Sequence, residues 1–107
     1  MNNVAHSPAA YARPKFSGLG AFPLTPLRDD SVDEQAFIGL IERLAASGVD
    51  SITALGSTGS YAYLSTPERA RVAQLAVAHA GGTPVHVGVG ALRTSDVLEN
   101  VRHAEDA

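Results

Sequence analysis

The sequence predicts an α/β fold in which strands and helices alternate and the strands run parallel. Strand-like segments start near Ser17, Asp50 and Pro84, at intervals of 33 and 34 residues. Each is followed by a loop rich in glycine, proline or hydroxyl side chains, and then by apolar residues at helical spacing. A repeated strand-helix unit of this length connects parallel strands by right-handed crossovers. We therefore expect three consecutive βα units.

The first unit begins with a short strand over residues 17–23, which Pro23 and Pro26 end. We expect Ser31 to cap the following helix, with Glu34 three residues later completing a capping box. One apolar face is predicted for this helix, made of Phe37, Leu40, Ile41, Leu44 and Ala45. Gly48 stands where a left-handed residue ends a helix.

The second unit has a strand over residues 51–55 and the loop GSTGS over 56–60. A capping box of Ser65 and Glu68 starts its helix, with Pro67 in the first turn. Its predicted inner face consists of Val72, Leu75, Ala76 and His79. The third unit has a strand over residues 85–89 and a helix capped by Thr94. Its predicted apolar stripe consists of Val97, Leu98, Val101 and Ala104.

Three βα units in simple order place all their helices on one face of the sheet and leave the other face bare. Parallel sheets are normally covered on both faces, so a larger sheet or partner chains must supply the cover. Eight such units come to roughly the 250 residues of a (β/α)₈ barrel. We interpret residues 16–107 as the N-terminal three βα units of a (β/α)₈ TIM barrel, and residues 1–15 as a flexible N-terminal tail.

Composition excludes several classes of function. Eight Lys and Arg residues against eleven Asp and Glu residues give a net charge of −3, so neither nucleic acid nor a membrane is expected as a partner. The chain has no cysteine, no apolar run of about 20 residues and no signal-peptide pattern, so we expect a soluble cytoplasmic protein. Lys15 is the only lysine, which confines side-chain amine chemistry to that position.

The loops that follow the strands are the candidate site, because function in a barrel lies at that edge. The loop over 56–60 is the most suggestive, since its glycines allow a close backbone approach and its N–H and hydroxyl groups suit a carboxylate or a phosphate. The alternative is an ordinary turn between strand and helix. A P-loop is excluded because no lysine follows a glycine there, and Arg93 occupies the third glycine position of a dinucleotide fingerprint.

Other polar residues give weaker signals. His86 alternates with two valines and faces the barrel interior, as a core histidine or a catalytic one. Tyr61 and Tyr63 either pack under the loop or reach a pocket above it, and Arg93 either faces an anionic substrate or is solvated. No pair of histidines has metal-ligand spacing, so no metal and no cofactor are expected. Ser57 has no evident His and Asp partners for a hydrolase triad.

The segments FSGLGAFPLTPL, AASGVDSI, LGSTGS and PVHVGVGA together resemble the dihydrodipicolinate synthase/N-acetylneuraminate lyase family over about residues 16–107. This resemblance implies a class I, pyruvate-dependent aldolase on a (β/α)₈ barrel that forms a Schiff base with pyruvate or another 2-oxo acid. It also implies a homo-oligomer, a dimer or a tetramer.

Carried onto this sequence, the resemblance implies that Thr58 binds the pyruvate carboxylate through its N–H and hydroxyl. Ser57 would assist carboxylate binding or join a tyrosine proton relay, and Gly56 and Gly59 would shape the loop. The family usually has glutamate at the position of Ser60, and this departure leaves the subfamily, and hence the second substrate, open.

The family's Schiff-base lysine and catalytic tyrosine come from later strands, so this chain alone is expected to be inactive. Two alternative functions remain from the residues themselves. One is a non-catalytic βα module that associates with itself through the bare sheet face. The other is a small anion-binding or phosphate-binding domain that uses the glycine-rich loops.

Overall fold

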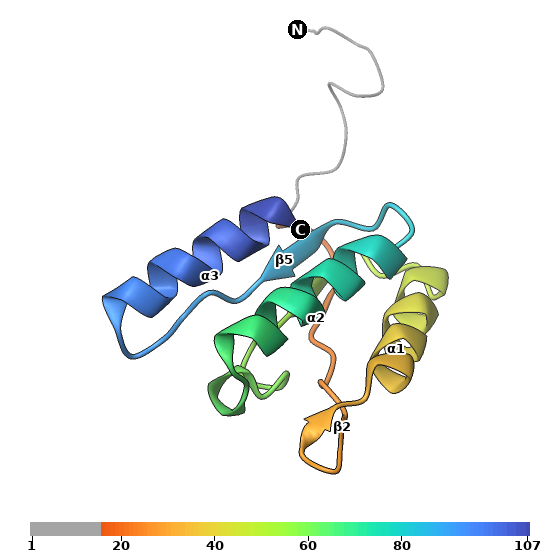
Figure 1. The fold of residues 1–107 in the computed structure, drawn as a ribbon. Coiled ribbons are helices and arrows are strands. Elements are labelled where there is room, and N and C mark those ends of the chain that lie inside the picture. The colour runs from red at the N-terminus through yellow and green to blue at the C-terminus, as the bar shows by residue number, and fades with distance from the viewer. Residues whose placement is uncertain (1–15) are drawn as a thin grey trace, which may run out of the picture.

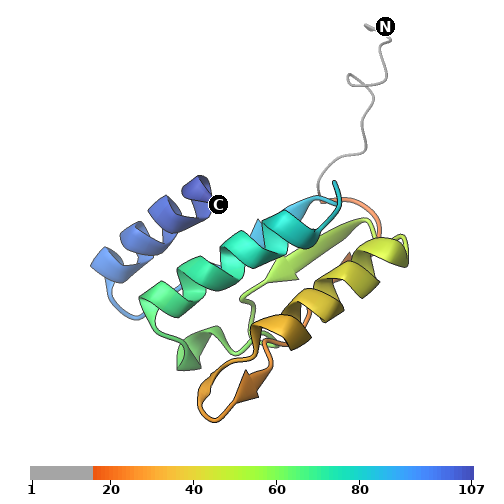
Figure 2. The same cartoon turned by 45° about the vertical axis from the view of Figure 1, so that its right-hand side comes forward.

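The computed structural model describes residues 16–107, so the predicted tail over 1–15 lies outside the described residues. Strands β1 (Gly20–Ala21), β4 (Ser51–Ala54) and β5 (Val85–Val87) form a parallel sheet in the order β1-β4-β5. Helices α1 (Glu34–Ala46), α2 (Thr66–His79) and α3 (Thr94–Asp106) lie side by side against one face of this sheet (Figures 1 and 2). The predicted α/β fold with parallel strands is confirmed.

The hydrophobic core lies between the helices and the middle strand. Phe37 and Ile41 of α1 pack there against Ile52 of β4 and Val72 of α2, and none of these four side chains is exposed. Most of the two predicted stripes therefore faces the sheet. Burial of such side chains contributes about 1.5–3 kcal/mol each to folding. The prediction is wrong for His79 of α2, which is partly exposed and contacts Glu42 instead. The stripe of α3 is only partly covered within the described residues, because Leu98 and Val101 are exposed.

A β-hairpin between β1 and α1 was not predicted. Strands β2 (Leu27–Arg28) and β3 (Ser31–Val32) pair antiparallel around Asp29 and Asp30, which both have positive φ angles of 51° and 64°. Aspartate tolerates this left-handed backbone better than most residues, and two such residues make the tight turn that suits a hairpin. The hairpin projects beyond the sheet at the lower edge of Figure 1.

Two predicted helix caps are wrong. Ser31 belongs to β3, and Asp33 caps α1 instead, its carboxylate accepting the Ala36 N–H at 3.1 Å. The hairpin delays the helix by two residues, so the Ser31 side chain is no longer at its start. Thr94 is the first residue of α3, and Arg93 occupies the cap position without a side-chain hydrogen bond. The capping box of Ser65 and Glu68 in α2 is confirmed.

The sheet face opposite the helices is uncovered in the described part of the chain, as the simple strand order predicted. In the register, Thr53 of β4 lies beside His86 of β5, and both neighbours of His86 pack toward the core. His86 therefore points to the uncovered face, where the Phe16 ring stacks on it with centroids 4.6 Å apart. Phe22, just after β1, is 57% exposed.

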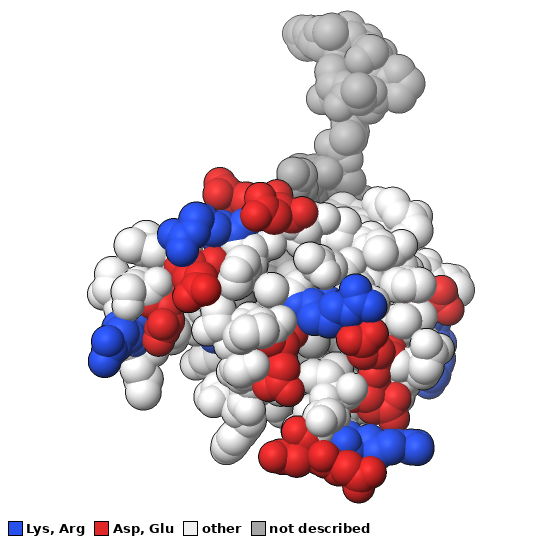
Figure 3. Space-filling view, in the orientation of Figure 1, with Lys and Arg blue, Asp and Glu red and all other residues white. Residues whose placement is uncertain are grey.

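The outer surface of the helices carries charges of both signs, which lie interspersed on the face seen in Figure 3. An ion pair joins α1 to α2 there, with the Arg71 Nε atom 2.9 Å from a carboxylate oxygen of Glu34. The His79 imidazole adds a second contact, 3.1 Å from the Glu42 carboxylate. Among the described residues, none of the helices has the length and apolar character needed to cross a bilayer.

Candidate functional site

The bend over residues 56–59 follows the middle strand, so it lies at the carboxyl end of the parallel sheet. Leu55 joins β4 to this bend with a left-handed backbone of φ 60°. For a branched side chain this conformation is strained, and such strain persists where the surrounding structure enforces it, often at functional sites. Here the enforcement comes from the core, because the Leu55 side chain is buried in it.

Two successive turns give the bend its shape. The Gly59 N–H donates to the Gly56 carbonyl and the Ser60 N–H donates to the Ser57 carbonyl, both at 3.0 Å. A Cβ at Gly59 would lie 3.0 to 3.3 Å from backbone atoms of Leu55 and Gly56, a tight contact that favours glycine there. Ser57 and Thr58 are exposed, and within residues 16–107 their N–H groups have no hydrogen-bond partner. The bend thus presents two N–H donors and two hydroxyls together.

The loop after β5 supports the bend from one side. The Gly88 N–H donates to the Ala54 carbonyl at 2.9 Å, which extends the pairing of β4 and β5 by one step. The Gly88 Cα lies so close to the Leu55 carbonyl that any side chain at this position would overlap it. Gly88 is therefore the point at which the loops following β4 and β5 touch.

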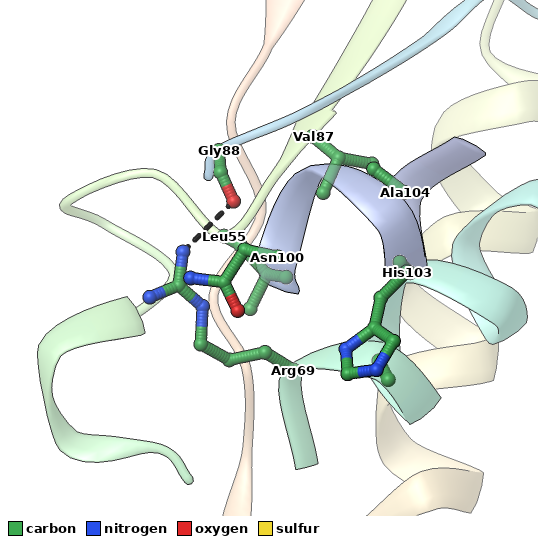
Figure 4. A pocket seen from close by; sticks show the side chains of 9 residues that line it. Leu55, Arg69, Val87, Gly88, Asn100, His103 and Ala104 are labelled. Atoms are coloured by element: carbon green, nitrogen blue, oxygen red, sulfur yellow. Dashed lines mark hydrogen bonds between the residues drawn. The ribbon is translucent and has the colours of Figure 1, made fainter. Parts of the chain in front are cut away.

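Two buried polar side chains hold the loop after β5 in place (Figure 4). Arg69 of α2 is 6% exposed, and its guanidinium donates to the carbonyls of Gly88 and Gly90 at 2.9 and 2.8 Å. Asn100 of α3 is 5% exposed and donates through Nδ2 to the Val89 carbonyl at 3.3 Å. Three consecutive carbonyls are thus bound by side chains from two helices.

The surroundings of Arg69 are apolar on one side and aromatic on the other. Burial lowers the pKa of the Arg69 guanidinium, while the nearby Tyr61 raises it. The Tyr61 ring centroid lies 5.2 Å from the guanidinium carbon, a favourable cation–π distance. On its outer side Arg69 also lines a groove of about 500 Å³ between residues 61–66 and the start of α3.

The loop after β1 approaches the bend from the opposite side. The Phe22 ring packs over Gly56, where a side chain would crowd it. Thr25 is buried, and its hydroxyl has no hydrogen-bond partner among the residues that the structure describes. The Pro26 carbonyl accepts the Asp33 N–H at 2.8 Å, which ties this loop to the start of α1. All three predicted loops therefore meet at one edge of the sheet.

The remaining candidates from the sequence take different positions. Tyr61 is half-buried, packs against the core and also lines the groove, whereas Tyr63 is 84% exposed. Arg93 is exposed at the start of α3, away from the bend's own contacts. His86 faces the uncovered sheet side, and its Nε2 atom is buried without a hydrogen-bond partner among residues 16–107. No cluster of metal-ligating side chains occurs in that same range.

Sequence reasoning missed Arg69 and Asn100. A signal was present for each, because a polar residue stands in register with an apolar helix face. Arg69 precedes Val72, Ala73 and Ala76 by three, four and seven residues, and Asn100 stands three residues after Val97. A polar side chain at such a position is buried by the helix packing, so it needs hydrogen-bond partners inside the protein.

Comparison with known proteins places the chain in a family. The sequence profile of the Dihydrodipicolinate synthetase family matches residues 15–107. The 4-hydroxy-tetrahydrodipicolinate synthase of Phenylobacterium zucineum is 42% identical over 93 residues, 86% of this chain and 32% of the relative. The chain therefore spans about a third of the length of the curated relatives that it matches.

Solved structures agree with the sequence comparison. Proteus mirabilis N-acetylneuraminate lyase superposes with a TM-score of 0.80 at 38% identity, covering 86% of this chain and 32% of that one. YagE, a prophage protein of Escherichia coli in complex with pyruvate, superposes with a TM-score of 0.79 at 30% identity, covering 85% and 31%. The predicted fold, the N-terminal three βα units of a (β/α)₈ barrel, is thereby confirmed, and the chain belongs to the dihydrodipicolinate synthetase family.

Proposed function

We propose that this chain supplies the first three βα units of a Schiff-base-forming, pyruvate-dependent lyase, and that its bend over residues 56–59 binds the pyruvate carboxylate. Membership of a family that includes a synthase and a lyase supports the class of reaction. The pyruvate bound by the relative YagE supports the 2-oxo acid.

One observation carries the assignment of the bend. Ser57 and Thr58 present adjacent N–H groups and hydroxyls at the carboxyl end of the middle strand, and those N–H groups are not used by other described residues. A carboxylate needs several donors that converge on two oxygens, and charge-assisted hydrogen bonds of this kind are about twice as strong as neutral ones. In this proposal the bend fixes the carboxylate, and so sets where the 2-oxo carbon lies.

The covalent step requires a lysine near that carbon. Attack by a neutral lysine amine on the 2-oxo group forms an imine and releases water, and the protonated imine then accepts electrons from the adjacent carbon. Lys15 precedes β1 in the sequence, whereas the bend follows β4 at the carboxyl end of the sheet. We therefore propose that the lysine, and the tyrosine that moves protons, come from outside these 107 residues.

Borohydride reduction tests this proposal directly, because it converts a pyruvate imine into a stable adduct. The complete polypeptide encoded by this reading frame is incubated with pyruvate, reduced, digested and analysed by mass spectrometry. We expect an adduct on a lysine beyond residue 107, and no adduct on the 107-residue chain expressed alone. An adduct on Lys15, or none on the complete polypeptide, would contradict the proposal.

A second candidate function has one observation in its favour. Leu19, Phe22 and Leu24 are exposed in the described part of the chain, and the sheet face beside them is bare. Exposed apolar patches of this kind mark interaction surfaces. The chain alone would then act as a self-associating, non-catalytic βα module. The complete polypeptide distinguishes the two: a defined oligomer in size-exclusion chromatography that forms no pyruvate adduct on borohydride reduction favours the module, whereas an adduct beyond residue 107 favours the lyase.

A further inference from the structure

Arg69 is a buried cation whose partners are main-chain carbonyls. It stands on the apolar face of α2, and no carboxylate pairs with it among residues 16–107. Burying a guanidinium is costly unless its donors are satisfied. Its fork-shaped donor set suits two acceptors held side by side, which is the geometry that Gly88 and Gly90 provide. The arginine therefore holds a loop and does not complete an ion pair.

The loop that Arg69 holds is the loop that supports the bend. Gly88 touches the carbonyl of Leu55, the strained residue at which the bend begins. Asn100 binds the carbonyl between the two that Arg69 binds, so the loop has little freedom to move away from Leu55. Figure 4 shows Arg69, Asn100, Gly88 and Leu55 gathered around one small cavity between α2, α3 and β5.

Arg69 also contacts the chain on the other side of the bend. Its guanidinium lies over the ring of Tyr61, which follows the bend directly after Ser60. The Arg69 side chain thus binds the loop that lies against Leu55, just before the bend, and also contacts Tyr61, two residues after the bend. Two of its nitrogens are hydrogen-bonded to carbonyls of this loop and the residue is 6% exposed, so most of its donor capacity is directed at the loop. Its Nε atom has no hydrogen-bond partner among residues 16–107.

We propose that Arg69 is a positioning residue for 2-oxo acid binding: it locks the loop over residues 88–90 against Leu55 and so fixes the donor geometry of Ser57 and Thr58. This inference rests on the proposed function of the bend. Loss of Arg69 should weaken pyruvate binding by roughly tenfold, the effect of losing about one charge-assisted hydrogen bond. The rate of imine reduction at saturating pyruvate should change much less.

The test measures half-saturating pyruvate by borohydride trapping in the complete polypeptide, for wild type, R69A, R69K and R71A. R69A should raise the half-saturating concentration, and added guanidinium ion at millimolar concentration should lower it again by filling the space left. R69K should fall between wild type and R69A, because an ammonium does not present two parallel donors. R71A is the matched control, since Arg71 stands two residues away on the same helix and pairs with Glu34 at the exposed surface.

Each outcome separates the possible roles. A role in stability alone would lower the fraction of protein that can be trapped, with half-saturation within about twofold of wild type in R69A and R69K; that result overturns the proposal. If R69A does not fold, the rise in R69K carries the decision. A wild-type protein that traps no pyruvate overturns the proposed function as well, whereas trapping with an unchanged half-saturation in R69A and R69K overturns only the role of Arg69.

Discussion

Thr58 presents a hydroxyl and a main-chain N–H from the same exposed position of the bend. The change Thr58→Val removes the hydroxyl and keeps both the shape of the side chain and the N–H. We expect half-saturating pyruvate to rise by roughly tenfold in the trapping assay, because one hydrogen bond to a charged group is lost. Thr83→Val is the control, since Thr83 precedes β5 at the opposite end of the sheet. If the two variants have the same half-saturating pyruvate concentration, the Thr58 hydroxyl does not bind the carboxylate.

Ser65 forms a capping box with Glu68 at the start of α2. Its hydroxyl accepts the Glu68 N–H at 3.2 Å while the Glu68 carboxylate accepts the Ser65 N–H at 2.8 Å. Ser65→Ala should reduce the free energy of unfolding by about 1 kcal/mol, the usual value of an N-terminal cap. Denaturant unfolding measures it, with Ser95→Ala, an exposed residue in the first turn of α3, as control. A loss no larger than that of the control would show that the cap is dispensable.

Between elements, the Arg71–Glu34 pair joins α2 to α1 at the surface. Hydrogen bonds from Arg71 hold the pKa of the Glu34 carboxyl below its ordinary value of 4.5. A carboxyl whose pKa is lowered by folding stabilises the folded state above its unfolded pKa, and this contribution is lost as the pH falls through the folded-state pKa. The contribution is small, because both side chains are exposed.

The variant Glu34→Gln tests this linkage. It should be less stable than wild type at neutral pH, and the two stability curves should converge below pH 4.5. Urea unfolding across that pH range measures it. Glu105→Gln serves as control, because Glu105 is an exposed residue of α3 in no ion pair within the described residues. A difference between wild type and the Glu34 variant that stays constant with pH would contradict the assignment.

Most elements were predictable from local pattern, because each helix carries an apolar stripe at helical spacing and each strand stands before a turn. The exceptions have a local cause. Two aspartates with left-handed backbone fold residues 27–32 into a hairpin, and nothing in the spacing of apolar residues distinguishes that hairpin from a loop. The helix start shifts with it, from Ser31 to Asp33.

The candidate site was predictable only in part. Glycines and hydroxyls identify the bend over residues 56–59 in the sequence. Its supports are not visible there, because Arg69 and Asn100 lie on separate helices and act through the main-chain carbonyls of residues 88–90, which lie next to Leu55. Such contacts leave no compositional signature apart from a polar residue on an apolar face.

At the scale of the molecule, the three helices cover one face of the sheet and none of them covers the other (Figure 2). Phe22, just after β1, is exposed. We expect the 107-residue chain alone to elute above its monomer size, and Phe22→Ser to move it toward the monomer by reducing the exposed apolar area. The control is Val77→Ser, which also replaces an exposed apolar residue by serine but on α2, away from that sheet face; it should have no such effect. A monomer for all three proteins would argue against association through the sheet face.

Leu55 has two structural roles at once. The same residue fills the interior with its side chain and sets the direction of the bend over residues 56–59 with its backbone. A glycine at this position would relieve the left-handed backbone but would leave a cavity in the core, so packing and backbone direction cannot be changed independently here.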